Sequence, residues 1–472
     1  MAPGECDEKN QYPSGLSLAL ILTSCFICTF LTSLDRMIIS TAIPRVTGDF
    51  KSVTDIAWYG SAYLLAQCAS QLLYGKIYTF FGIKGTFLTS ILLFEIGSAV
   101  CGAAPNFVAF IIGRAIAGLG ASGILGGVLV IFVHALPLHK RPLYQGMFDA
   151  VFGVSSVTGP LLRGVFTSKV SWRWCFYINL PLGSVAAVVI YFILKIPNKE
   201  ATQLDLKAKL KQLDFYSTGF LMPGLVCMIQ DLEWGVALLN GTWWSDRKII
   251  VLLVLSGLLF IGFVLVRYFL PGTATIPPRI FKQRSILAGF FSVICVGSQL
   301  TIFDDTSSQR FPYYVPIWFQ AIQGVSAVES GIHFLLLVLS MVVSILSSGV
   351  LIRHMGYYTP VMTLGVSSLM YFGNYMSSAI FLSVAQNTFN NQLLRRLSSI
   401  PGVNPGKVLD SGVTSLTDLP ESVRVAVLVA YNEAIRHIFL LALVLVCLGM
   451  LGASSLGWRS TKKDVDKTKT GD

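Results

Sequence analysis

The stretch GRAIAGLGASGILGG, residues 113–127, decides the fold, because it lies within an apolar run over 107–131 that is long enough to cross a bilayer as a helix. Its glycines include a GxxxG pair, Gly123 and Gly127, and small residues let helix backbones approach closely in lipid. Arg114 stands about seven residues inside the run. A charge there is costly enough to suggest a function, the structural alternative being a side chain that snorkels to the outer surface.

Comparable apolar blocks follow one another along the chain of 472 residues, which is 54% hydrophobic and only 12% charged. Ordinary soluble domains carry about 25% charge, and a block of about 20 apolar residues spans a membrane. The sequence therefore predicts an all-α polytopic membrane protein with twelve spans. The predicted spans are 16–37, 56–75, 85–104, 107–131, 146–166, 174–195, 215–234, 248–270, 286–303, 332–352, 357–385 and 435–457.

The orientation follows from the lysines and arginines, most of which fall in segments that are cytoplasmic if both ends of the chain lie inside. Since they serve this purpose, the net charge of +11 does not indicate a nucleic-acid partner. The NGT triplet at 240–242 falls in a loop that this topology places outside, which predicts that Asn240 is a glycosylation site.

The charged stretch 196–214 divides the chain into two halves. We expect the first six spans to form a bundle over 16–195, followed by this cytoplasmic linker. The family resemblance given below implies that 215–270 forms two additional helices and that 271–457 forms a second, incomplete bundle. That second bundle contains an external loop at 386–434, and the tails 1–15 and 458–472 are cytoplasmic.

Several polar side chains fall within the predicted spans, where they are candidates for a function. Asp35 and Glu95, with Arg114, are the candidates for proton coupling. The alternatives are an interfacial ion pair of Asp35 with its neighbour Arg36 and, for Glu95, a neutral carboxyl group bonded to an adjacent helix. Two further residues one turn apart are candidates for facing a cavity or, alternatively, for bonding between helices: Gln67 and Gln71.

The sequence contains no motif for a nucleotide, metal or cofactor site. There is no GxxxxGK[ST] nucleotide motif, so export driven by ATP has no support. The nine cysteines show no metal spacing, and no cluster of histidine, cysteine and carboxylate suggests an enzyme or a cofactor. An ion gradient is the remaining energy source.

Five motifs in order resemble those of the major facilitator superfamily. They are LDRMIISTAIP (34–44), GKIYTFFGIK (75–84), GRAIAGLGASG (113–123), the antiporter motif that begins at Gly146 and ends in GPLLRG (159–164), and WRWCFYINLPLG (172–183). The resemblance is to the fourteen-helix drug:proton antiporter branch, and within it to fungal efflux transporters of toxins and drugs. It implies a two-bundle fold, with functional residues in a cytoplasmic loop motif and in an antiporter motif. The matching residues are Gly75, Gly82 and Lys84 for the loop, and Gly146, Gly159, Pro160 and Gly164 for the antiporter motif.

This resemblance implies a monomeric secondary transporter that exports small hydrophobic compounds in exchange for protons. It needs no cofactor, nucleotide or nucleic acid, and it resides in the plasma membrane or alternatively in a vacuolar or other internal membrane. A shortened protein without transport activity, or an uptake carrier for another small molecule, are the alternatives, because a fold alone does not fix a function.

The chain departs from the family pattern in ways that leave three interpretations open: a gene-model artefact, a splice form, or a decayed transporter. Thr79 stands where the loop motif has an acidic residue, and Ser155 and Arg163 stand where the antiporter motif has glycines. The second half is short: about 60–80 residues, or two helices with their loops, are absent between Leu369 and Met370. The branch would have 14 spans where this sequence predicts twelve.

Overall fold

The computed structural model describes most of the first half of the chain and a smaller part of the second half. The residues described are 13, 15–50, 56–137, 140–169, 171–195, 209, 215–237, 247–269, 286–295, 343, 372–374, 376–377, 381, 388–389, 391–400 and 421–454, and within these helices some side chains are not described. All regular secondary structure in the described ranges is helical. The predicted all-α class is therefore confirmed.

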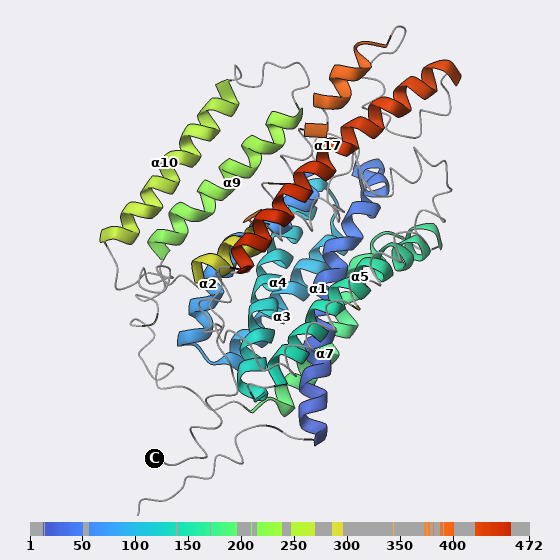
Figure 1. Cartoon of the computed structure of the whole chain (residues 1–472). Coiled ribbons are helices and arrows are strands. Elements are labelled where there is room, and N and C mark those ends of the chain that lie inside the picture. The colour runs from blue at the N-terminus through green and yellow to red at the C-terminus, as the bar shows by residue number, and fades with distance from the viewer. Residues whose placement is uncertain are drawn as a thin grey trace, which may run out of the picture.

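The helices follow the predicted order through the first half of the chain (Figure 1). Their bounds are α1 Gly15–Phe50, α2 Ile56–Phe80, α3 Ile83–Ala103, α4 Phe107–Ala135, α5 Arg141–Lys169, α6 Trp174–Tyr177, α7 Asn179–Ile193, α9 Phe215–Ala237, α10 Arg247–Phe269 and α17 Glu421–Ser454. The sixth predicted span is divided at Ile178 into α6 and α7. The predicted spans 332–352 and 357–385 lie almost entirely outside the described residues.

Helix α4 is the centre of the N-terminal bundle, where it packs extensively against both α2 and α3. Helix α1 packs against α5 and α7 on the other side, and α9 and α10 form a separate antiparallel pair that touches the bundle through α2. Of the apolar window of α4, 72% is buried, whereas only 11% of the corresponding window of α10 is buried. The most glycine-rich helix is thus the most enclosed one.

Glycines bring α4 into direct backbone contact with its neighbours. A Cβ atom built on Gly120 would lie 2.3 Å from the backbone nitrogen of Phe94 in α3, and one built on Gly118 would lie 2.3 Å from the carbonyl oxygen of Tyr63 in α2. On the facing helix, a Cβ atom on Gly97 would lie 2.3 Å from the nitrogen of Ala117. These close approaches are the small-residue packing that membrane helices use in place of a hydrophobic driving force.

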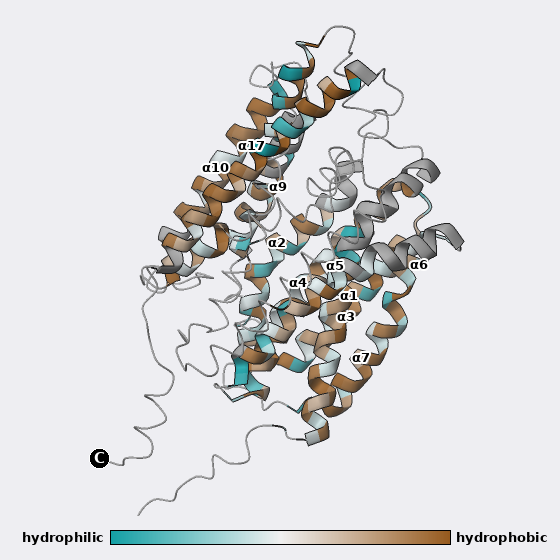
Figure 2. Cartoon of the chain, turned by 45° about the vertical axis from the view of Figure 1, so that its right-hand side comes forward, coloured by the Kyte–Doolittle hydropathy of each residue, from teal (hydrophilic) through white to brown (hydrophobic). Residues whose placement is uncertain are grey.

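The peripheral helices α7 and α10 consist mostly of apolar residues, which are brown in Figure 2. In α10, Val251, Leu258 and Val264 each expose more than half of their surface. Six helical segments in the described ranges are long and apolar enough to cross a membrane: Gly15–Arg36, Ile83–Ala103, Phe107–Ala135, Trp174–Ile193, Arg247–Val266 and Val423–Leu451. The protein is therefore a multi-pass membrane protein whose exposed apolar faces meet lipid.

Helix α1 extends beyond its predicted span of 16–37, because it continues to Phe50. Its strongly apolar part ends at Arg36, one residue short of the predicted boundary. A drop in hydropathy marks where a helix leaves the apolar layer of the membrane. The backbone hydrogen bonds of the helix do not depend on hydropathy, so the helix can continue beyond that point. The predicted span of 16–37 therefore agrees with the apolar part of α1, and the helix continues beyond that span.

The end of α4 is capped by the first residue of α5. Arg141 donates a hydrogen bond from Nη2 to the carbonyl oxygen of Val133 at 2.8 Å and another from Nε to that of Leu136 at 3.0 Å. The last carbonyl groups of a helix lack partners within the helix, and they carry the negative end of its dipole. Arg141 thus satisfies acceptors that would otherwise compete for water near the membrane surface.

We expect Arg141→Met to lower the stability of the protein by about 1–2 kcal/mol, because it removes two hydrogen bonds from a charged donor. Arg141→Lys retains the charge and one donor, so it should lose less than half as much. Thermal unfolding of the purified protein in detergent measures both changes. Equal unfolding temperatures for Arg141→Met and the unchanged protein would contradict the capping role.

Candidate functional site

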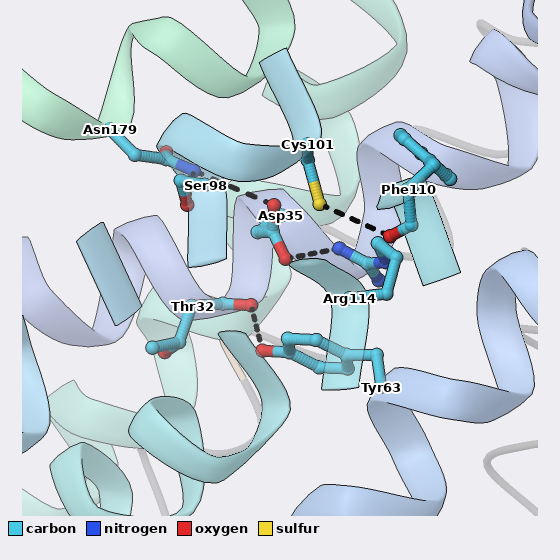
Figure 3. Close-up of polar contacts among 8 residues, drawn as sticks. All are labelled: Thr32, Asp35, Tyr63, Ser98, Cys101, Phe110, Arg114 and Asn179. Atoms are coloured by element: carbon cyan, nitrogen blue, oxygen red, sulfur yellow. Dashed lines mark hydrogen bonds and ion pairs between the residues drawn. The ribbon is translucent and has the colours of Figure 1, made fainter. Parts of the chain in front are cut away.

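A buried ion pair joins α1 to α4. Nη1 of Arg114 donates to Oδ2 of Asp35 at 2.5 Å, and the two side chains are 1% and 0% exposed (Figure 3). Both alternatives from the sequence are therefore wrong: Arg114 does not snorkel to a surface, and Asp35 does not form an interfacial pair with Arg36. A pair of opposite charges removed from solvent is strongly coupled, since losing either partner leaves an uncompensated charge.

Helix α2 supplies an aromatic surface for the guanidinium group. The centre of that group lies 4.3 Å from the centroid of the Tyr63 ring, which is a cation–π contact. The hydroxyl group of Tyr63 donates to the carbonyl oxygen of Thr32 at 3.2 Å and so fixes the ring against α1. Asp35 and Arg114 are consequently held by three helices.

Helix α7 approaches the pair from the opposite side. Nδ2 of Asn179 donates to Oδ1 of Asp35 at 3.5 Å and to Oγ of Ser98 in α3 at 3.1 Å. Each carboxylate oxygen of Asp35 thus has its own donor, one from α4 and one from α7. Oδ1 of Asn179 is buried and has no hydrogen-bond partner among the described residues.

Three aromatic rings close one end of this polar group. Phe110 lies edge-on to both Trp172 and Phe176, with ring centroids 5.9 Å and 5.4 Å apart, and Trp172 packs in the same way against Phe176. All three side chains are buried, together with Cys101 beside the pair. The rings share a buried apolar cluster with Cys101 and with Leu34, the neighbour of Asp35 in α1.

Glu95 is not part of this group. It is half-buried on α3, where Oγ of Ser184 in α7 donates to its Oε1 at 3.4 Å. Leu92 and Ile96, its neighbours in α3, expose 55% and 44% of their surface. Glu95 therefore lies toward the outer, lipid-facing side of the contact between α3 and α7. Its bond to Ser184 is the bond to an adjacent helix that the sequence analysis gave as the alternative.

Gln67 and Gln71 are both buried on α2. Oγ of Ser122 in α4 donates to Oε1 of Gln71 at 3.1 Å, which is the predicted bond between helices. Oε1 of Gln67 and Nε2 of Gln71 have no partner among the described residues. The two amides thus leave one acceptor and one donor unused inside the bundle.

The residues of the two family motifs lie at helix junctions and within α5. Gly82 forms the break between α2 and α3, and Lys84 places its ammonium group 4.9 Å from the centroid of the Tyr191 ring. Gly75 is buried in α2, and Gly146 and Gly159 are buried in α5. Helix α5 remains helical through Pro160, Arg163 and Gly164, whose side-chain environments lie outside the described residues, as does Asn240.

Metal and disulfide sites are absent from the part of the chain that the structure describes. The eight cysteines there are free, and no group of histidine, cysteine or carboxylate side chains in those ranges is arranged to hold a metal ion. Most of these cysteines are buried among apolar side chains, where they act as small packing residues.

A sequence profile of the Major Facilitator Superfamily matches residues 25–388, which is most of the chain. The chain belongs to this superfamily. The transporter is 41% identical to an MFS-type transporter of Claviceps purpurea, an alignment that covers 95% of this chain and 86% of its relative. It is 37% identical to the efflux pump aflT of Aspergillus parasiticus, with 98% and 99% covered, and 38% identical to the rubrofusarin-specific efflux pump aurT of Gibberella zeae, with 96% and 92% covered.

Solved structures agree on the fold. The transporter resembles the crystal structure of an auto-inhibited POT family peptide transporter with a TM-score of 0.54, over 94% of this chain and 98% of that one, at 15% identity. The two-bundle architecture expected from the motifs is thereby confirmed. Because members of the superfamily are transporters, the chain is not an enzyme.

The alignments also show an internal shortening. The alignment with the Claviceps protein runs over 510 positions although it includes 95% of only 472 residues, so about 60 positions of that relative have no counterpart here. This agrees in size with the deletion expected from the sequence. Its predicted place, between Leu369 and Met370, lies outside the described residues.

Proposed function

We propose that the transporter exports small hydrophobic compounds in exchange for protons, with Asp35 as the group that binds the proton and Arg114 as its charged partner. The observation that carries this proposal is the buried ion pair between α1 and α4. Two relatives are named as efflux pumps, and one of them is named as specific for rubrofusarin. These names support a cargo of small aromatic compounds.

The pair offers a simple way to couple a proton to a conformational change. Ionised Asp35 attracts Arg114, and the pair as a whole is neutral. A proton from the aqueous phase that binds Asp35 cancels this attraction and leaves the pair with a net positive charge in a buried place, which is unfavourable. The helices then gain by moving apart and admitting water, and this opening is one half of an alternating-access cycle.

Gln67 and Gln71 are the side chains that we propose for contact with the cargo. Their unused acceptor and donor lie one helical turn apart on α2. A buried polar group without a partner costs free energy, so a compound that bonds to either amide would recover it. Compounds that carry hydroxyl and carbonyl groups on an apolar frame meet this requirement.

Transport in reconstituted liposomes tests the proposal. The full chain is placed in vesicles with an imposed pH gradient, and movement of rubrofusarin and of a hydrophobic fluorescent dye is followed with and without a protonophore. We expect transport that the protonophore abolishes and that Asp35→Asn abolishes. Transport that persists in both cases would contradict proton coupling, and accumulation against the expected direction would favour an uptake carrier.

Glu95→Gln separates the two acidic candidates. Because Glu95 lies toward the lipid-facing side and contacts Ser184 rather than the ion pair, we expect its substitution to change the initial rate of proton-driven transport by less than about twofold. The control is Asp35→Asn in the same vesicles, which should lose nearly all activity. A loss as large for Glu95→Gln as for Asp35→Asn would move the coupling site to the contact between α3 and α7.

The internal shortening supports a second candidate, a transporter-derived protein that does not transport. About 60 positions missing from the alignment correspond to two membrane crossings with their loops. Sequencing the transcript decides whether the message encodes the missing segment. If it does not, a chain with the segment of a relative inserted should transport in the liposome assay while the unchanged chain does not.

The remaining assignments are the topology, the oligomeric state and the membrane. We propose a monomer in the plasma membrane, with a vacuolar or other internal membrane as the alternative, and with Asn240 on the outer face. The positive charges of the intervening loops support this orientation. Enzymatic removal of glycans, compared between the unchanged chain and Asn240→Gln, tests it through a change in apparent mass.

A further inference from the structure

The amide of Asn179, a residue of α7, lies between Ser98 of α3 and the ion pair. The attraction between Asp35 and Arg114 does not by itself explain why an amide is there. It is fully buried, and its Nδ2 is shared between Oδ1 of Asp35 and Oγ of Ser98. Its Oδ1 accepts no hydrogen bond from any described residue. An unused acceptor in a dry place is costly, so its retention beside a carboxylate calls for a physical reason.

The two partners of Asp35 differ in what they can do when its carboxyl group is protonated. The guanidinium group of Arg114 has donors only, so it cannot accept a hydrogen bond from the new O–H group. An asparagine amide has both a donor and an acceptor, and turning it by half a turn about its last bond exchanges them. In the described structure the donor faces Asp35 and the acceptor is free, which is the arrangement suited to the ionised carboxylate.

We propose that Asn179 is a positioning residue that reports the protonation of Asp35 to α7. It donates to the ionised carboxylate, and after the amide turns it accepts from the protonated carboxyl group. Proton binding therefore transfers the stronger contact of Asp35 from Arg114 on α4 to Asn179 on α7. This inference rests on the proposed role of Asp35 as the proton-binding group.

Ser98 can remain bonded to the amide of Asn179 in both of its orientations. Its hydroxyl group now accepts from Nδ2 of Asn179 at 3.1 Å, and a hydroxyl group can donate equally well. After the turn, the Asn179 oxygen has two lone pairs and accepts from both Asp35 and Ser98. The contact between α3 and α7 is therefore kept in both states, while the contact of α7 with α1 is strengthened when the proton is bound.

Few other titratable or charged groups face the carboxyl group of Asp35. In the described part of the chain they are Arg114 of α4 with the Tyr63 ring against it, the Cys101 thiol of α3, and Arg36, the next residue in α1. Helix α7 carries no charged residue at all. The only acidic residue of α5, Asp149, is bonded to Gln145, and the side chain of Arg163 lies outside the described residues.

The pH profile of transport tests the inference. Asn179→Leu replaces the amide by an apolar group of similar size, and Asn179→Ala removes it without adding bulk. Both leave the protonated carboxyl group of Asp35 without an acceptor, whereas the bond lost from the ionised form is the long one at 3.5 Å. We expect the pH midpoint of exchange to fall by about one unit, which corresponds to a tenfold change in the proton equilibrium, with substrate binding unchanged within about twofold.

Ser98→Ala is the matched control. It removes the other partner of the amide and leaves Asn179 able to reach Asp35, so the pH midpoint should stay where it is in the unchanged protein. An unchanged midpoint in both Asn179→Leu and Asn179→Ala would overturn the inference, as would an equal shift in Ser98→Ala. If the unchanged protein shows no pH-dependent exchange, the proposed function itself fails, which is a distinguishable result.

Infrared difference spectra of the unsubstituted protein give a second measurement that does not depend on how the variants fold. On acidification, the carboxyl band of Asp35, identified by its loss in Asp35→Asn, should rise together with a change in an asparagine amide band identified by isotope-labelled asparagine. Both changes should be absent in Asp35→Asn. A carboxyl band that rises with no change in any asparagine amide band would overturn the inference.

Discussion

Arg114→Leu should destabilise the folded protein by about 3–5 kcal/mol and abolish proton-driven export, because it leaves the Asp35 carboxylate buried without its charged partner. Asp35→Leu should be similarly costly, since it leaves the buried guanidinium group without the carboxylate to which it bonds at 2.5 Å. Thermal unfolding in detergent and transport in liposomes measure the two effects separately.

The double substitution Asp35→Leu with Arg114→Leu is the informative control. Replacing both members of a buried ion pair by apolar side chains is often neutral or stabilising, so stability should return to within about 1 kcal/mol of that of the unchanged protein. Transport should not return, because the proton-binding group is gone. Recovery of export in the double variant would show that the pair has a structural role only.

Gly120→Ala should prevent α3 and α4 from packing as they do. The added Cβ atom would meet the backbone of Phe94 at 2.3 Å, and a backbone cannot move aside as the end of a side chain can. We expect a loss of about 1–3 kcal/mol or more, measured as a lower unfolding temperature and a lower yield of folded protein.

Gly126→Ala in the same helix is the matched control for Gly120→Ala. There the added Cβ atom would lie 3.6 Å from Nε2 of Gln71, which is an ordinary contact. Alanine is also the better helix former, so stability should be unchanged or rise by a few tenths of a kcal/mol to about 1 kcal/mol. Equal losses in the two variants would show that glycine acts through the backbone of α4 and not through its contact with α3.

The sequence was sufficient for the features that depend on a single helix. The length and apolarity of each block predicted the helices of the first half. The functional role expected for Arg114 from its charge within an apolar run stays a prediction. The predicted span of 16–37 matches the apolar part of α1, which ends at Arg36, but hydropathy did not predict that the helix continues to Phe50.

The partners of Arg114 could not be predicted from the same patterns. Asp35 is 79 residues away from it, and Asn179 is 144 residues away from Asp35. Such contacts depend on which helices are neighbours and how each is rotated, and neither property is encoded locally. The same limit applied to Glu95, because the sequence does not show on which side of α3 it lies. It also applied to Asn179, which falls within the motif WRWCFYINLPLG (172–183) but was not recognised there as a partner of Asp35.

The burial of Arg114 in α4 also bears on how the chain enters the bilayer during synthesis. An arginine or aspartate at the centre of a membrane helix raises the free energy of insertion by about 2.5–3.5 kcal/mol on scales measured with the insertion machinery, and the cost is smaller toward the helix ends, where Asp35 and Arg114 lie. Helix α1 emerges from the ribosome well before α4, so Asp35 must wait while α2 and α3 are made. We expect α1 to be retained beside the translocation channel until α4 arrives, and the two helices to pass into lipid together.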